Sequence, residues 1–184
     1  MFFRLSELRV ADWVRVRYPN LYIEQTLKHG VRRLRCTTGD DQVRFFRLLT
    51  GVFEPPYFLL YVRHTLRGAG ALGRFQSGAL SPDDLREFLA VFADFLSGDG
   101  RHDLWLSAPN SGAQVVWDRH DVFYVYGRLE PVEALLRDRG FQEGEAGIPS
   151  PHAHNYHPEF DDAERRLLDY YDWLQSPLQP ADEQ

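Results

Sequence analysis

The chain has 184 residues, of which 43% are hydrophobic and 26% are charged, and its formal net charge is −6. This length fits about one domain, and the abundance of Phe, Tyr and Trp excludes an intrinsically disordered chain. The longest apolar run covers residues 57–62, far short of the ~20 residues that a membrane helix needs, and no apolar signal segment follows Met1. We therefore expect a soluble cytoplasmic protein without a membrane partner.

Basic residues are concentrated in the first half of the chain and acidic residues near its end. Arginine supplies 20 of the 21 basic residues, with Lys28 as the exception, a bias typical of GC-rich bacterial genomes. The asymmetry has two interpretations: an anionic partner binds at one end, or the two ends pair with each other. Because the net charge is negative and phosphate binding needs a concentrated basic face, nucleic acid is a disfavoured partner.

Turn residues and apolar periodicity divide the first half of the chain into short elements. Residues 11–17 fit a helix or a strand equally. Pro19 suits the first turn of a helix over 19–28, and Gly30 suits its end. The remaining signals predict a strand over 31–37, a helix that follows residues 38–41 and ends at Gly51, a buried strand over 57–62 and an extended loop over 68–78.

The second half carries the clearest helix start, Ser81-Pro82-Asp83-Asp84. Ser81 is a favoured N-cap, Pro82 fits the first helical position, and the two acids favour the positive end of the helix dipole. Apolar spacing extends this helix to Gly98. Further signals predict strands over 103–107, 114–117 and 122–126 joined by turns at 109–112 and 118–121, a helix over 131–139, a strand over 141–145 and a helix over 162–174.

These elements predict an α+β fold with a mostly antiparallel sheet packed by amphipathic helices. The strands over 103–126 would form a three-strand meander inside a split βαβ (ferredoxin-like) core with additions. A doubly wound parallel sheet is the alternative, which the short hairpin turns disfavour because parallel neighbours need long crossovers. We expect a single domain over residues 1–175 and a polar, frayed tail over 176–184.

Three of the seven histidines lie within six residues, in the segment Pro151–Glu159. In an extended segment His152 and His154 point to the same side, and His157 and Glu159 can turn back toward them. Such a set of imidazole and carboxylate groups suits zinc or another transition metal, with one coordination position left for water. The alternative is a loop without a metal, since the spacing matches no metalloenzyme motif such as H-E-x-x-H.

A glycine-rich segment, residues 68–73, matches the pattern G-x-G-x-x-G. No helix opens directly after it, so the context of a dinucleotide site is missing. A loop of this kind can still bind a small anion when cations flank it. The flanking cations here are Arg63, Arg67 and Arg74.

The triplet Arg-His-Asp occurs twice, at residues 101–103 and 119–121, next to predicted strand ends. If the first two strands of the meander pair, both triplets lie near the same end of the hairpin. A histidine beside an aspartate is the basis of a general base, in which the carboxylate orients the ring. The alternative is an ordinary polar turn, because no nucleophile motif accompanies the pair.

Aromatic residues are dense in the predicted meander, which contains Trp105, Trp117, Tyr124 and Tyr126. Since alternate residues of a strand face opposite sides, part of this set can form an exposed surface for a partner. The alternative is a sheet with both faces covered and these rings in the core. Cys36, the single cysteine, lies in a predicted strand, where a small buried hydrophobe is favoured over a reactive thiol.

Three functions follow from these patterns. We expect foremost a non-catalytic binding module that engages a protein or a small anionic ligand through the aromatic meander and the arginines beside the glycine-rich loop. The alternative is a metal-dependent hydrolase or oxygenase that uses the histidine cluster. A third is a homo-oligomeric module, such as a homodimer, that packs through aromatic residues at the end of the last helix, namely Tyr170, Tyr171 and Trp173.

Overall fold

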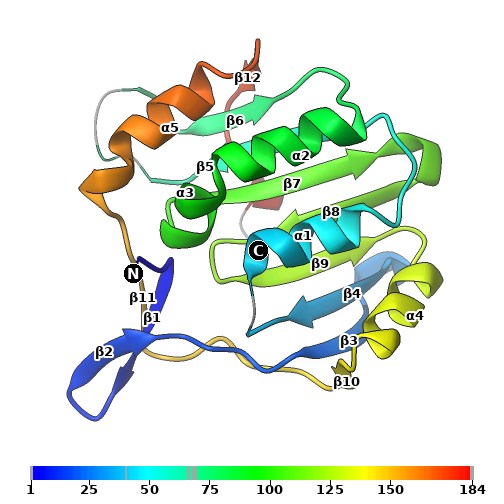
Figure 1. Ribbon diagram of the computed structural model, residues 1–184. Helices are drawn as coiled ribbons and strands as arrows, with labels where there is room; N and C mark the ends of the chain where they lie inside the picture. The colour runs from blue at the N-terminus through cyan, green and yellow to red at the C-terminus, as the bar shows by residue number, and fades with distance from the viewer. Residues whose placement is uncertain (1, 40, 66, 68–69, 183–184) are drawn as a thin grey trace.

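In the part of the chain that the structure describes, nine strands form the main sheet of this α+β protein (Figure 1). The computed structural model describes residues 2–39, 41–65, 67 and 70–182. The strand order is β10-β3-β4-β9-β8-β7-β5-β6-β12, and neighbours are antiparallel except for the parallel pair β10–β3. The strands are β3 (Leu21–Thr26), β4 (Arg32–Thr37), β5 (Phe58–Arg63), β6 (Gly73–Gln76), β7 (His102–Ala108), β8 (Ala113–Trp117), β9 (Val122–Tyr126), β10 (Gln142–Glu143) and β12 (Leu174–Ser176).

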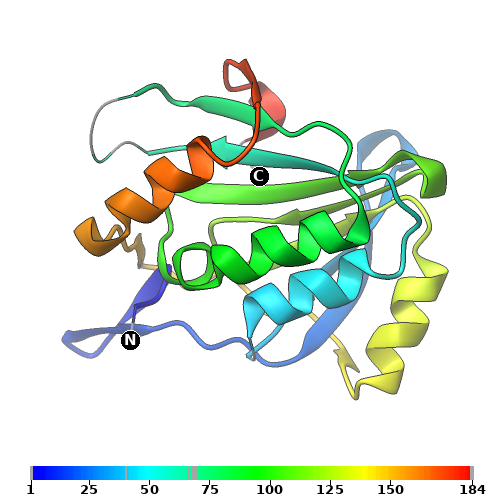
Figure 2. The same cartoon turned by 45° about the horizontal axis from the view of Figure 1, so that its top comes forward.

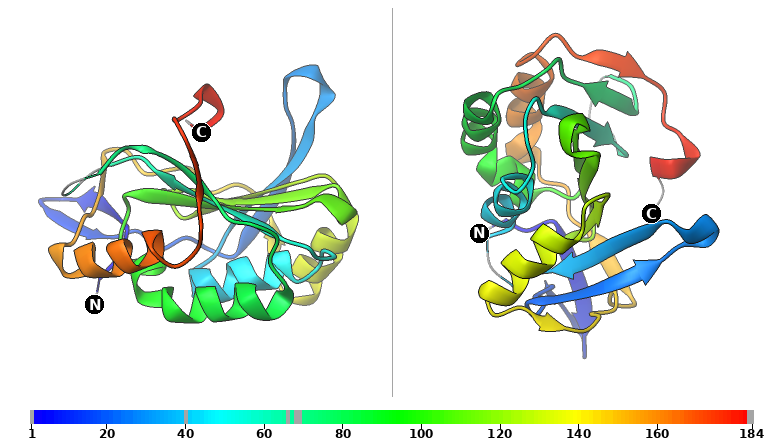
Figure 3. Two further views of the ribbon diagram at one scale, coloured as in Figure 1. Left: turned by 90° about the horizontal axis from the view of Figure 1, so that it is seen from above. Right: turned by 90° about the vertical axis from the view of Figure 1, so that its right-hand side faces the viewer.

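The α-helices of the described chain lie on one face of this sheet, as the view from above shows (Figure 3). Within this layer α1 lies beside α2 and α3 (Figure 2). In the part of the chain that the structure describes, no helix has the length and apolar character to cross a membrane. The helices are α1 (Gln42–Thr50), α2 (Pro82–Val91), α3 (Ala93–Gly98), α4 (Glu130–Asp138) and α5 (Asp161–Leu168).

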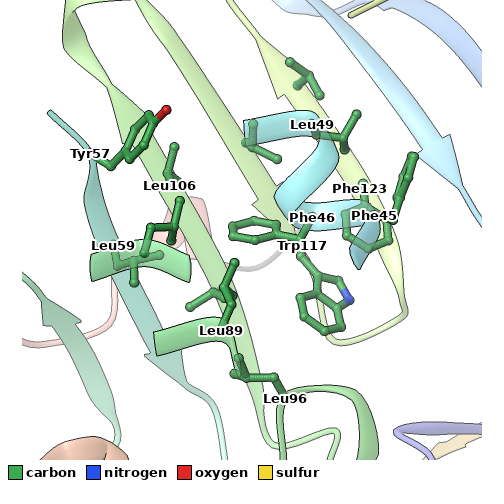
Figure 4. Close-up of a cluster of buried hydrophobic side chains, with 14 of the residues drawn as sticks. Phe45, Phe46, Leu49, Tyr57, Leu59, Leu89, Leu96, Leu106, Trp117 and Phe123 are labelled. Atoms are coloured by element: carbon green, nitrogen blue, oxygen red, sulfur yellow. The ribbon is translucent and has the colours of Figure 1, made fainter. Parts of the chain in front are cut away.

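The main core fills the space between the helices and the sheet (Figure 4). Phe46 of α1 packs on the indole of Trp117 in β8, with 6.1 Å between the ring centroids. Trp117 in turn stacks on Phe123 of β9 at 5.5 Å. All three rings are fully buried. Because an aromatic side chain removes a large apolar area from water, this column of rings fixes α1 to the middle of the sheet.

A smaller core covers the opposite face of the central strands. Trp105 of β7 and Tyr124 of β9 belong to it, and Leu5, Val16 and Tyr18 from the N-terminal segment pack against them. Both faces of the central strands are therefore buried. This is why β7, β8 and β9 are nearly continuous runs of buried residues rather than alternating ones.

Local signals placed several elements correctly, including the strand over 31–37 and the helix that ends at Gly51. Asp41 caps α1, since its Oδ1 accepts the backbone N–H of Arg44 at 2.9 Å. Ser81 and Asp84 form a reciprocal capping box at the start of α2. The helix predicted to reach Gly98 is interrupted instead, because the backbone leaves helical geometry at Phe92 and α3 begins after it.

The predicted helix over 19–28 is wrong, because residues 21–26 form the strand β3. Tyr22 is buried there and pairs with Cys36 of β4, and β10 adds a parallel partner on the other side. The proline signal at the start of this segment is local, whereas the pairing partners are distant in sequence. Tertiary pairing therefore overrides the local preference.

Two strands at one edge of the sheet also lie where the sequence predicted other structure. Residues 73–76, predicted as loop, form β6 beside β5. The predicted helix over 162–174 ends at Leu168 as α5, and residues 174–176 form β12, which pairs with β6. The split βαβ arrangement inside this larger sheet stays a prediction.

Arginines from the first half of the chain pair with acids from its end. The buried Arg63 makes a bidentate ion pair with Glu164, with Nη2 2.7 Å from Oε2. Arg101, from the second half of the chain, also contacts this carboxylate, with its Nη1 3.0 Å away. The basic and acidic parts of the chain therefore pair with each other, which is one of the two interpretations of the charge asymmetry. Two further pairs follow the same pattern, Arg67–Asp161 at 3.2 Å and Arg74–Asp182 at 2.7 Å.

Candidate metal centre

Three histidines from two distant segments meet beside the main sheet. His120 lies in the turn between β8 and β9, and His152 and His154 lie on strand β11 (His152–His154). A ring nitrogen of each lies within 4.8 Å of the others. The ring centroids are 4.9 Å apart for His120–His154, 5.3 Å for His120–His152 and 5.4 Å for His152–His154.

A small second sheet holds β11 in its extended form. Its strand order is β11-β1-β2, with β1 covering Leu5–Arg9 and β2 covering Asp12–Arg15, and β11 lies beside β1 in Figure 1. His154 pairs with Leu5 and His152 with Glu7 in antiparallel register. Because strand residues two apart share a face, this pairing directs both imidazoles to the same side.

The turn that carries His120 is fixed by Asp118. The Oδ1 atom of Asp118 accepts the backbone N–H groups of His120 and Val122, both at 2.9 Å. An aspartate that bonds to the backbone two residues on is the usual determinant of such a turn. The predicted turn over 118–121 is confirmed, and it brings His120 to the side of β11.

The Nδ1 atoms of two of these rings have fixed partners. His120 Nδ1 lies 3.2 Å from Asp118 Oδ2, and His152 Nδ1 lies 2.8 Å from the backbone carbonyl of Pro149. Since both partners are acceptors, each neutral ring carries its proton on Nδ1 and has a lone pair on Nε2. Carboxylates and carbonyls in this position orient histidines that bind metals.

The third ring, His154, is partly buried and uncharged at neutral pH. Burial lowers its pKa to about 3, and the neighbouring His120 and Arg119 add to this effect. Its Nδ1 is enclosed and has no hydrogen-bond partner among the described residues. Neutral imidazole is the form that coordinates a metal ion. The three rings together bring three imidazole groups to one site.

His157 and Glu159, the other two members of the ligand set predicted from the sequence, lie outside this group. The ring of His157 packs on Phe2, with 4.7 Å between the ring centroids. Glu159 is exposed and lies in a short 3-10 helix over Pro158–Phe160. Both residues follow the end of β11 at His154, with His157 just before this helix and Glu159 within it.

The two Arg-His-Asp triplets meet at one end of the β7–β8 hairpin. Asp103 Oδ1 accepts the backbone N–H of Arg119 at 2.8 Å, and His64 Nε2 lies 2.9 Å from Asp103 Oδ2. His102 takes a different place, because its ring is fully buried at 5.0 Å from the Tyr61 ring. Burial and nearby cations, of which Arg4 is the first, hold the pKa of His102 well below its usual value.

The aromatic side chains predicted as a partner surface are mostly interior. Trp117 is completely buried, and Trp105 and Tyr124 are 6% and 5% exposed. Tyr126 is partly exposed and accepts a hydrogen bond from Arg33 at 3.0 Å. Little of the surface of Trp105, Trp117 and Tyr124 is therefore accessible to a partner.

The remaining predicted sites are also engaged in contacts within the chain. Tyr170, Tyr171 and Trp173, predicted as a dimer surface, pack around Phe88 of α2. Cys36 is fully buried, and burial raises the pKa of its thiol. Both observations fit a small core residue rather than a reactive thiol. Gly68 and Ala69 of the G-x-G-x-x-G segment lie outside the described residues.

His120 is the member of this three-histidine group that the sequence assigned to a different feature. It was recognised as part of a histidine–aspartate pair in a turn, 32 positions before the nearest clustered histidine. Periodicity within one segment cannot connect positions that far apart. A usable signal was its location at a hairpin end, where exposed polar groups from separate segments can converge.

Comparisons of the chain with protein-family models, with curated proteins and with solved structures find no match.

Proposed function

We propose that this protein binds one divalent transition-metal ion, zinc or a chemically close ion, through His120, His152 and His154. The observation that supports the proposal is the convergence of three imidazole nitrogens within 4.8 Å of one another. Nitrogens bound at 2.0–2.1 Å to a tetrahedral zinc ion lie about 3.4 Å apart, so small rotations of the rings complete the site.

The same geometry supports a hydrolase. Three protein nitrogens on a tetrahedral ion leave the fourth position for water, the arrangement of catalytic rather than structural zinc sites. A bound ion would lower the pKa of that water toward about 7 and provide hydroxide near neutral pH. Hydrolysis is preferred over oxygenation because non-haem iron oxygenases use two histidines and a carboxylate, and the group among the described residues has no carboxylate.

The first experiment measures metal content and affinity. Tag-free protein prepared without chelator is analysed for Zn, Ni, Fe and Co, then stripped and titrated with Zn²⁺ and Co²⁺. We expect about one ion per chain in the wild type and less than a tenth of that in His120→Ala and His154→Ala.

His157→Ala is the matched control, since it removes a neighbouring histidine outside the group. It should retain the ion, whereas the ligand set predicted from the sequence requires its loss. Wild-type protein that takes up no ion after addition of metal contradicts the proposal. Activity on ester, amide and phosphoester substrates that returns only with metal supports the hydrolase. Metal-loaded protein without this activity contradicts the hydrolase and leaves metal binding as the proposed function.

The non-catalytic binding module and the homodimer stay predictions.

A further inference from the structure

A surface cavity is lined by residues of α1 and of the C-terminal end of α4. These two helices lie away from β1 and β11 in Figure 1. The cavity has a volume of about 570 Å³, within the range of small-molecule pockets. Its lining includes Arg44 and Arg47 from α1 and Arg139 from the end of α4. We propose that this cavity binds a small planar organic molecule that carries a phosphate monoester, independently of the metal centre.

The placement of the cations supports an anionic ligand. Arg44 is the third residue of α1, where the helix dipole disfavours a positive charge, and Arg47 follows one turn later on the same side. All three arginines are exposed, and none forms an ion pair with another residue in the described part of the chain. Asp41, which also lines the cavity, uses its Oδ1 to cap α1.

The charge balance sets the type of anion. Among the residues that the structure describes, three guanidinium groups and one carboxylate give the lining a local charge of +2. A phosphate monoester carries about −1.5 to −2 at neutral pH and offers three acceptor oxygens, which match the forked donors of arginine. A carboxylate would leave part of this charge uncompensated.

The apolar part of the lining sets the rest of the ligand. Phe141 stacks on Phe45 with 5.1 Å between the ring centroids and 10° between the ring planes. Phe45 is buried, and Phe141 is partly exposed. Because Phe141 is partly exposed and lines the cavity, its ring offers an apolar surface to a planar group. Leu48 extends the apolar wall. A ring beside a phosphate therefore fits the cavity better than phosphate alone.

Phenylphosphonate is the probe, because its P–C bond resists hydrolysis. Isothermal titration at low salt, with and without bound Zn²⁺, should show one site with the same affinity in both states. The double variant Arg44→Gln/Arg47→Gln should weaken binding roughly tenfold or more, since two charge-assisted contacts are lost. Arg137→Gln is the matched control, an exposed arginine of α4 outside the cavity, and should change affinity less than about twofold.

Inorganic phosphate should bind roughly tenfold more weakly than phenylphosphonate, because it lacks the ring. Three results overturn the proposal: no binding of phenylphosphonate, equal affinity for the two anions, or the same loss in Arg137→Gln as in the double variant. Binding that needs Zn²⁺ and ignores the double variant belongs to the metal centre and overturns it as well. Metal binding measured on the double variant stays normal in every case, so the outcome is separate from the proposed function.

Discussion

Asp118 holds His120 from two directions. Its Oδ1 accepts the His120 backbone N–H at 2.9 Å, and its Oδ2 lies 3.2 Å from the Nδ1 of the same ring. One carboxylate thereby fixes both the position of the residue and the tautomer of its imidazole. The lone pair of the neutral ring is then on Nε2, which is the nitrogen left to bind a metal ion.

Replacement of Asp118 by Asn tests this relationship. The amide oxygen can still accept the backbone N–H, but the amide nitrogen is a donor and favours the His120 tautomer with its proton on Nε2. We expect Zn²⁺ affinity to fall by about 10- to 100-fold, measured by competition with a chelating dye. The control is Asp138→Asn at the exposed end of α4. An unchanged affinity in a folded Asp118→Asn protein contradicts the role of the carboxylate.

Glu164 is the second residue whose loss should be severe. Its Oε2 accepts hydrogen bonds from Arg63 Nη2 at 2.7 Å and from Arg101 Nη1 at 3.0 Å. All three side chains are buried. Glu164→Gln removes the counter-charge of the buried Arg63, whereas Arg101 keeps its buried partner Asp99 at 2.7 Å, so we expect the free energy of unfolding to fall by about 3–5 kcal/mol. Urea denaturation measures the change. Asp162→Asn removes the exposed partner of Arg165 and should cost less than about 1 kcal/mol. Similar losses in the two variants contradict the prediction.

His102 should make the protein sensitive to acid. Its folded pKa is far below its usual value because the ring is buried, whereas in the unfolded chain it takes up a proton near pH 6.5. The unfolded state therefore binds more protons below pH 6.5, and stability falls as pH decreases through this window.

His102→Phe keeps an aromatic ring and removes the titration. Between pH 7 and pH 5 the wild type should lose about 2 kcal/mol more stability than this variant. Chemical denaturation at several pH values measures the difference. Parallel curves for the two proteins mean that His102 does not contribute.

Trp117 should act as a core residue. It is fully buried between Phe46 and Phe123, and its Nε1 donates to Asp121 at 3.0 Å. Trp117→Ala should destabilise the protein by about 3–5 kcal/mol, as truncation of a buried aromatic ring does. Trp13, which is 51% exposed, is the comparison, and Trp13→Ala should cost much less. Thermal unfolding of both variants checks this. A small loss for Trp117→Ala would restore it as a candidate for partner binding.

The sequence by itself determined the elements whose causes are local. Ser81 and Asp84 predict the start of α2, because a capping box depends only on a few neighbouring residues. The turns at 109–112 and 118–121 are recognisable for the same reason, and Gly112 takes the left-handed conformation that its turn requires. The alternation of β11 places His152 and His154 on one face once the segment is extended.

The tertiary structure alone decided which distant segments meet. Residues 21–26 became a strand because β4 and β10 supply partners from far along the chain. His120 lies beside His152 and His154 because the pairing with β1 fixes the position of β11. His157 lies outside this group, on the segment that leads into the 3-10 helix. Long-range pairing and burial select among the alternatives that local preferences leave open, and one segment's periodicity contains no information about its partners.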